Sequence, residues 1–221
     1  MKMRIAVLLL TILCLALTGA AQTIYNDGGI DGNDNAIFIT GPANPNFLGS
    51  VQDISNGFVA ALSGTPGQLE WGEWSVGAPT SFSYELGTSA FGTDIGSGTI
   101  AQNAGNTTLL FTNGLGYGVY DVEVPIFGST MTAGNEYWLS ISNATDANND
   151  GTQAWDLAGP NGGPATCNFR QSGTNFGDCG LGGESFTLSA GGTTTPEPSS
   201  ILLLGSGILG LAGVLRRKLT R

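Results

Sequence analysis

The sequence predicts an all-β protein: an antiparallel, jelly-roll-like β-sandwich over residues 22–190, flanked by an N-terminal signal peptide and a C-terminal transmembrane helix. Two features of the middle of the chain favour strands. Apolar and polar side chains alternate in short segments, and the segments are separated by stretches rich in Gly, Asn, Ser and Thr. Between the two ends, the sequence has no long stretch of apolar residues at helical spacing. Many half-buried antiparallel strands in succession are typical of a sandwich.

Residues 1–21 have the features of a secretory signal peptide. Two basic residues precede the apolar run 5–17, and Gly19 and Ala21 supply the small residues expected before a cleavage site after Ala21. The apolar run is too short to cross a bilayer as a helix. The N-terminus therefore predicts export.

Four segments show the strand pattern most clearly. In residues 81–86, Phe82, Tyr84 and Leu86 fall on one face and polar residues on the other, so we expect these three side chains in the core. The inward residues expected from segments 117–126, 136–142 and 184–190 are Tyr120, Val122, Val124, Ile126, Tyr137, Leu139, Ile141, Phe186 and Leu188.

The segment LEWGEWSV, residues 69–76, departs from simple alternation. Strict alternation would place Trp71 and Trp74 on opposite faces of the sheet. A glycine inside a strand often marks a bulge. We therefore expect a bulge at Gly72 that brings both tryptophans to one face.

The predicted exported domain is strongly acidic. Between the two terminal segments there are 17 acidic residues against Arg170 alone, a net charge of −16. Such a surface repels nucleic acid and anionic lipid; it keeps the protein soluble or attracts divalent cations. The chain has no histidine, which excludes a histidine general base and the Ser-His-Asp arrangement. Glu70 and Glu73 resemble a glycosidase pair only by chance in so acidic a chain, so we expect no enzyme.

Two cysteines, Cys167 and Cys179, remain after signal-peptide cleavage. Because an exported protein meets an oxidising environment, we expect a disulfide between them, which would stabilise the domain by about 3 kcal/mol. Two free thiols are the alternative.

The sequence DANNDGT, residues 146–152, is a candidate calcium loop. Asp146, Asn148 and Asp150 occupy alternate positions before a glycine, as in calcium loops that direct oxygen ligands toward one point. The twelfth position is Leu157 rather than the bidentate glutamate of an EF-hand. Asn-Asp-Gly is also a good turn sequence, so a solvated turn without calcium is the alternative.

Trp138 and Trp155 are candidate carbohydrate-binding residues. Trp138 is out of phase with the inward residues of its segment, and Trp155 precedes a charged residue. An exposed indole offers a flat face on which a sugar can stack. Burial under a neighbouring loop or sheet is the alternative.

The C-terminal region divides into three parts. Residues 191–198 form a polar tether, residues 199–215 an uncharged apolar segment, and residues 216–221 a basic end. As a helix, the apolar segment would reach about 25 Å, enough to span a thinned bilayer. The basic end predicts a cytoplasmic tail by the positive-inside rule.

Pro196, Glu197 and Pro198, followed by a glycine-bearing apolar helix and terminal arginines, resemble the PEP-CTERM sorting signal of Gram-negative bacteria. The resemblance implies a transient inner-membrane anchor and recognition by an exosortase. That membrane protease-transferase cuts near the motif and releases the protein to the cell surface or to exopolysaccharide.

The middle of the chain resembles the choice-anchor R type domain in the order of WGEWSV, SFSYELGTSAFGTDIGSGTI, YGVYDVEVPI, AGNEYWLSISNAT, AWDLAGPNGG and GESFTLS. That resemblance implies a domain that precedes a surface anchor and has no established enzyme activity. Two functions follow. The first is a non-catalytic cell-surface or exopolysaccharide-matrix protein. The second is a carbohydrate-binding module that uses exposed tryptophans and calcium to hold exopolysaccharide or a cell-surface glycan.

Overall fold

The structure is a computed structural model. It describes residues 21–32, 36–39, 52–148, 153–157, 166–171, 173–178 and 183–191. Residues 22–191 belong to one compact unit. The predicted tether beyond Gly191, the apolar helix, the basic tail, and all of the signal peptide except Ala21 lie outside the described residues. Within the described part of the chain, no helix has the length and apolar character needed to cross a membrane.

The described residues form thirteen strands and no helix, and every pairing between strands is antiparallel. The all-β, antiparallel prediction is confirmed. The seven-stranded sheet contains β1 (Thr23–Asn26), β2 (Ala36–Phe38), β4 (Pro66–Ser75), β7 (Thr107–Thr112), β8 (Gly118–Pro125), β10 (Ala154–Asp156) and β13 (Phe186–Ala190). The six-stranded sheet contains β3 (Gln52–Val59), β5 (Pro79–Gly87), β6 (Gly96–Ala101), β9 (Glu136–Asp146), β11 (Thr166–Gln171) and β12 (Thr174–Asp178).

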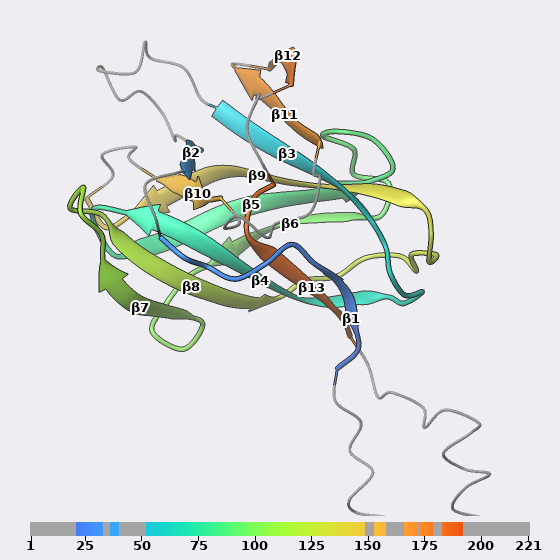
Figure 1. Ribbon diagram of the computed structural model, residues 1–221, viewed down its shortest axis with the longest axis horizontal. Helices are drawn as coiled ribbons and strands as arrows, with labels where there is room; N and C mark the ends of the chain where they lie inside the picture. The colour runs from blue at the N-terminus through green and yellow to red at the C-terminus, as the bar shows by residue number, and fades with distance from the viewer. Residues whose placement is uncertain are drawn as a thin grey trace, which may run out of the picture. The chain divides into compact units, whose positions relative to one another are not determined.

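The strand order joins segments that are far apart in the sequence (Figure 1). In the seven-stranded sheet the order is β1-β13-β4-β10-β2, with β8 also paired to β4 and β7 paired to β8. In the six-stranded sheet the order is β12-β11-β3-β9-β5-β6. Strand β11 therefore lies beside β3, although more than a hundred residues separate them in the chain.

Aromatic side chains from the two sheets meet in one core. Trp71 of β4 lies 5.1 Å from Phe82 of β5, and Phe186 of β13 lies 5.4 Å from Phe58 of β3, between ring centroids. The alternation predicted the inward positions correctly, apart from Tyr120, which is half-buried. The predicted residues that are buried are Phe82, Tyr84, Leu86, Val122, Val124, Ile126, Tyr137, Leu139, Ile141, Phe186 and Leu188.

The predicted bulge at Gly72 is wrong. Strand β4 pairs with β8 in an unbroken register through this position, so Trp71 and Trp74 face opposite sides. Trp71 enters the main core, whereas Trp74 packs in a second, smaller cluster with Val119 and Ala154. Gly72 is needed for close approach: a Cβ there would lie 2.7 Å from the Cβ of Asp156.

Candidate functional site

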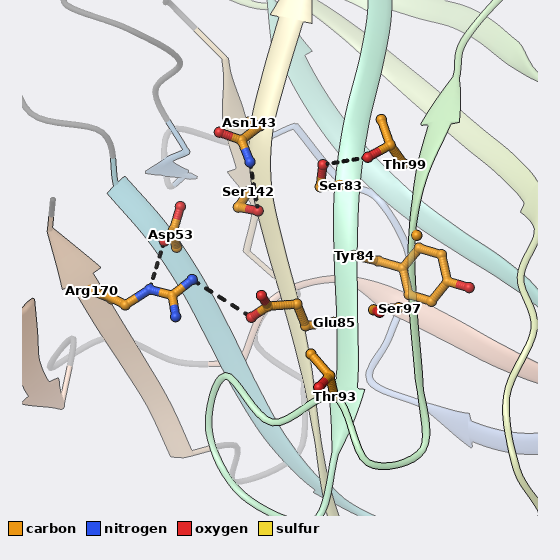
Figure 2. Close-up of a pocket in the computed structure, with 11 residues that line it drawn as sticks. Asp53, Ser83, Tyr84, Glu85, Thr93, Ser97, Thr99, Ser142, Asn143 and Arg170 are labelled. Carbon is orange, nitrogen blue, oxygen red and sulfur yellow. Dashed lines mark hydrogen bonds and ion pairs between the residues drawn. The ribbon is translucent and has the colours of Figure 1, made fainter. Parts of the chain in front are cut away.

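The outer face of the six-stranded sheet carries a polar groove with a volume of about 370 Å³ (Figure 2). We call it the Arg170 groove, after the only basic residue between the two terminal segments. Its lining comes from five neighbouring strands and the connection between β5 and β6. The lining residues are Asp53, Ser83, Tyr84, Glu85, Thr93, Ser97, Gly98, Thr99, Ser142, Asn143 and Arg170.

Strand alternation explains why polar side chains face outward here. Ile54 of β3 and Leu86 of β5 are fully buried, so the adjacent residues Asp53 and Glu85 point to the opposite face. The register between β11 and β3 then places Arg170 directly opposite Asp53. Three charged residues from distant parts of the sequence meet as a result.

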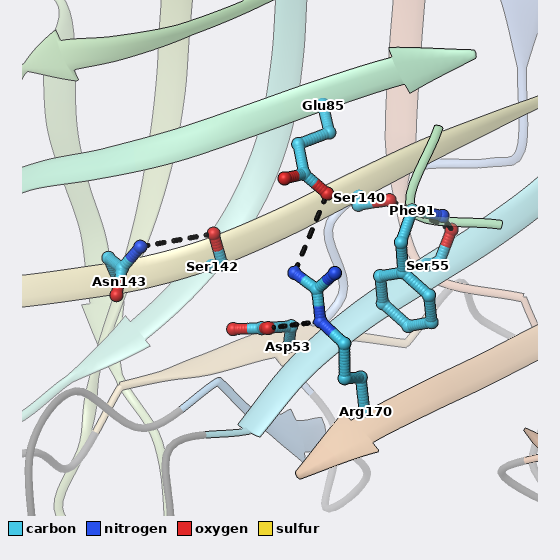
Figure 3. Close-up of polar contacts among 8 residues, drawn as sticks. All are labelled: Asp53, Ser55, Glu85, Phe91, Ser140, Ser142, Asn143 and Arg170. Atoms are coloured by element: carbon cyan, nitrogen blue, oxygen red, sulfur yellow. Dashed lines mark hydrogen bonds and ion pairs between the residues drawn. The ribbon is translucent and has the colours of Figure 1, made fainter. Parts of the chain in front are cut away.

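Arg170 forms ion pairs with both acidic residues. Its Nε donates a hydrogen bond to Asp53 Oδ2 at 2.7 Å, and its Nη2 lies 3.6 Å from Glu85 Oε2 (Figure 3). The side chains are 25% exposed for Arg170, 10% for Asp53 and 25% for Glu85, so solvent reaches the cluster without fully hydrating it. Burial raises the pKa of Glu85; the positive charge of Arg170 opposes this effect and the negative charge of Asp53 adds to it.

The connection between β5 and β6 borders the same cluster. The Phe91 ring lies 4.5 Å from the guanidinium carbon of Arg170, a cation–π contact. The backbone N–H of Phe91 donates to Ser55 Oγ at 3.3 Å, and Ser140 Oγ donates to the same oxygen at 2.9 Å. These bonds hold the connection against β3 and β9 beneath it.

Two residues with strained backbone conformations lie beside this groove. In the described part of the chain, the non-glycine residues with positive φ are Phe91, at 59°, and Asn143, at 50°. Asn143 lines the groove and Phe91 contacts Arg170. A bulky residue such as Phe in this region costs roughly 1–2 kcal/mol, and such residues cluster at functional sites. The surrounding hydrogen bonds hold Phe91 in this conformation.

The groove offers hydrogen-bonding groups of both kinds. Arg170 donates, the carboxylates of Asp53 and Glu85 accept, and the hydroxyls of Ser97 and Thr99 do both. This combination suits a ligand rich in hydroxyl groups.

The predicted carbohydrate-binding tryptophans lie elsewhere. The structure corrects the expectation for Trp155: it is fully buried, its ring centroid lies 5.9 Å from that of Trp71, and its indole N–H donates to the Ser185 carbonyl at 3.1 Å. It has no face on which a sugar could stack. Trp138 is half-buried and lies against Gly57, outside the lining of the groove.

Asp146 of the candidate calcium loop is buried, and its carboxylate has donors from the protein. Oδ2 accepts from the N–H of Gly77 at 2.8 Å and from the hydroxyl of Ser75 at 3.3 Å, and Oδ1 accepts from the N–H of Asn148 at 3.1 Å. Asp150 lies outside the described residues. No group of three or more acidic or cysteine side chains in the described ranges is placed to hold a metal. Calcium binding by this loop stays a prediction.

Two further sets of predicted residues lie partly or wholly outside the described part of the chain. Cys167 is buried in β11, and Cys179 lies outside the described residues, so their disulfide stays a prediction. Pro196, Glu197 and Pro198 also lie outside them.

The carboxylates of Glu70 and Glu73 lie on opposite faces of β4. Glu70 is exposed and Glu73 is fully buried. They do not face a common space, as the two carboxylates of a glycosidase must.

Sequence reasoning did not find the Arg170 groove. Its charged residues lie on three strands, and only the strand order brings them together. One feature could have indicated the groove: Arg170 is the sole basic residue of a very acidic domain.

Comparison with known proteins identifies the tail. The PEP-CTERM protein-sorting motif matches residues 194–218 and includes Pro196, Glu197 and Pro198. No curated protein matches the chain. The chain thus carries a PEP-CTERM sorting signal, which marks it as an exported surface protein processed by an exosortase.

Proposed function

We propose that the chain is a non-catalytic component of the cell surface or the exopolysaccharide matrix. The observation that carries this proposal is the sorting motif at residues 194–218, which directly follows a folded β-domain ending near Gly191. Cleavage near Glu197 would release that domain whole, because the last strand ends at Ala190. The net charge of −16 between the two ends supports solubility outside the cell.

The fold and family proposed for this domain are a jelly-roll-like β-sandwich of the choice-anchor R type. Support for the sandwich comes from the common core that side chains of both sheets enter, including Trp71 and Phe82. Support for the family is the sequence resemblance alone.

The sorting motif can be tested by substitution in a host that has an exosortase. We expect Glu197→Gln, or alanine at both Pro196 and Pro198, to leave full-length protein in the inner membrane. The reason is that the enzyme must recognise this short motif before it cuts. Fractionation and immunoblotting with an antibody to the β-domain would measure the distribution.

Glu136→Gln is the matched control, because it removes one carboxylate from an exposed position of β9. This variant should be released as the wild type is. Normal release of both motif variants would overturn the proposal of exosortase processing at Pro196–Pro198.

Carbohydrate binding is a second proposed function. The observation that favours it is the Arg170 groove, whose lining is mostly hydroxyl, carboxylate and amide side chains. The predicted tryptophans support it less, since Trp155 is buried and Trp138 lies outside the groove. A matrix protein with such a site could be retained by the polysaccharide around it.

A further inference from the structure

The Arg170 groove has the size of a small-molecule site but an unusual lining. Its volume of about 370 Å³ lies within the range of about 300–1,000 Å³ for ligand pockets. Such pockets are mostly lined by apolar side chains, with a few polar groups. Here nearly every lining side chain is polar, so an apolar ligand would bury polar groups without partners, at a cost in free energy.

The charges in the groove exclude one class of polar ligand. Asp53 and Glu85 both lie beside Arg170, so the cluster carries two negative charges for one positive charge. The rest of the exported domain adds to the negative potential. An acidic ligand that bound to the remaining N–H groups of Arg170 would lie beside the carboxylates of Asp53 and Glu85, and their repulsion disfavours it.

The same cluster suits neighbouring hydroxyl groups. The guanidinium of Arg170 has five N–H donors, and its two ion pairs involve Nε and Nη2. N–H groups at the end of the side chain stay available to a ligand oxygen. The carboxylates of Asp53 and Glu85 can accept from the hydroxyl hydrogens of the same ligand.

The groove is also held in place before any ligand arrives. The hydroxyls of Ser83 on β5 and Thr99 on β6 form a hydrogen bond, with 3.0 Å between the two oxygens. The hydrogen bond from Arg170 Nε holds the carboxylate of Asp53 in place. Thr88 donates from its backbone N–H and its hydroxyl to Asp94, at 3.0 and 2.9 Å, which closes the connection that carries Phe91. Preorganisation of this kind lowers the entropic cost of binding.

We infer that the Arg170 groove binds a saccharide that carries no acidic group, through Arg170, Asp53 and Glu85. This inference rests on the second proposed function, carbohydrate binding, and adds to it the site and the ligand class. It excludes uronic-acid and sulfated polymers as ligands of this groove.

The test is a glycan array probed with the full-length chain in detergent micelles, so that binding does not depend on tail cleavage. The array carries neutral hexose oligomers, N-acetylhexosamine oligomers and uronate oligomers. Thr99→Trp fills the groove from an exposed strand position, and Thr108→Trp places the same bulk at an exposed position of β7 in the other sheet. Thermal melting of both variants checks that they fold.

We expect binding to at least one neutral or N-acetylhexosamine oligomer. Thr99→Trp should weaken it by about tenfold or more by occluding the site, and Thr108→Trp should leave it unchanged. Binding to uronates alone would overturn the inferred ligand class while leaving carbohydrate binding in place. Binding that Thr99→Trp does not weaken would overturn the site. An array without any bound glycan would overturn both, and exosortase processing would be unaffected by that result.

Discussion

Raising the pH from about 5 to about 8.5 is expected to lower the free energy of unfolding of the β-domain. The cause is a pair of buried glutamates. Burial raises the pKa of Glu73 to about 8 and that of Glu184 to about 8, from an ordinary value of 4.5. The negative charge of Asp146 adds to the shift at Glu73, and a hydrogen bond from Gln102 opposes it.

These glutamates have little to stabilise their charged forms. Among the residues that the structure describes, neither carboxylate oxygen of Glu184, nor Oε1 of Glu73, has a hydrogen-bond partner. Arg170 is the only basic residue of the domain, and it pairs with Asp53 and Glu85 instead. Both glutamates are therefore expected to be largely protonated in the folded protein at neutral pH.

The sign of the effect follows from proton linkage. Between pH 4.5 and about 8, the folded state holds protons that the unfolded state has lost, so stability falls as the pH rises. Each glutamate contributes at most about 1.4 kcal/mol per pH unit in this window. Below it both states are protonated, and above it both are ionised, so the contribution is then constant.

Denaturant unfolding at a series of pH values measures this slope. The double variant Glu73→Gln and Glu184→Gln should flatten it, because neither position can then ionise. Glu136→Gln, at an exposed position of β9, should leave the slope as in the wild type. A wild-type stability that is constant or rises between pH 5 and 8.5 would show that these two glutamates do not titrate as described.

Replacement of Trp155 by alanine is expected to destabilise the domain by roughly 3–5 kcal/mol. Its side chain is fully buried, with ring centroids 5.9 Å from those of both Trp71 and Phe186. The substitution leaves a large cavity and removes the donor to the Ser185 carbonyl. Denaturant unfolding measures the change.

Trp138→Ala is the matched control, because that indole is half-buried on the outer face of β9. Its effect on stability should be clearly smaller. A loss at Trp155 no greater than that at Trp138 would mean that Trp155 is not a core residue. An exposed sugar-stacking tryptophan would typically change stability by less than about 0.5 kcal/mol.

The sequence predicted those parts of the fold that depend on local pattern. Alternation identified the inward residues of β5, β8, β9 and β13, because each strand has one apolar and one polar face. It gave no signal for β3, where Ser55 and Asn56 are buried side by side on opposite faces. Where neighbouring segments bury polar residues, a strand does not show the alternation of apolar and polar side chains.

The prediction that Trp155 is exposed was wrong for the same reason. All three residues of β10 are buried, so the charged neighbour Asp156 did not indicate an outer, solvent-facing side. Asp156 is held by donors from Trp74, Asp31 and Ser185, which only the tertiary structure brings to it.

The sorting signal and the Arg170 groove also differ in how far the sequence alone predicts them. The sorting signal is a continuous motif followed by a continuous apolar segment, so the sequence alone displays it. The Arg170 groove depends on β3, β5 and β11 lying in one sheet, and strand order between distant segments cannot be read from alternation.

We propose that an exosortase removes the tail and releases the β-domain. The most direct test is the intact mass of the protein recovered from the surface or medium of a host that has the enzyme. We expect a chain that begins at Gln22 and lacks everything beyond the Pro196–Ser199 region. A released protein whose mass still includes Arg221 would contradict it.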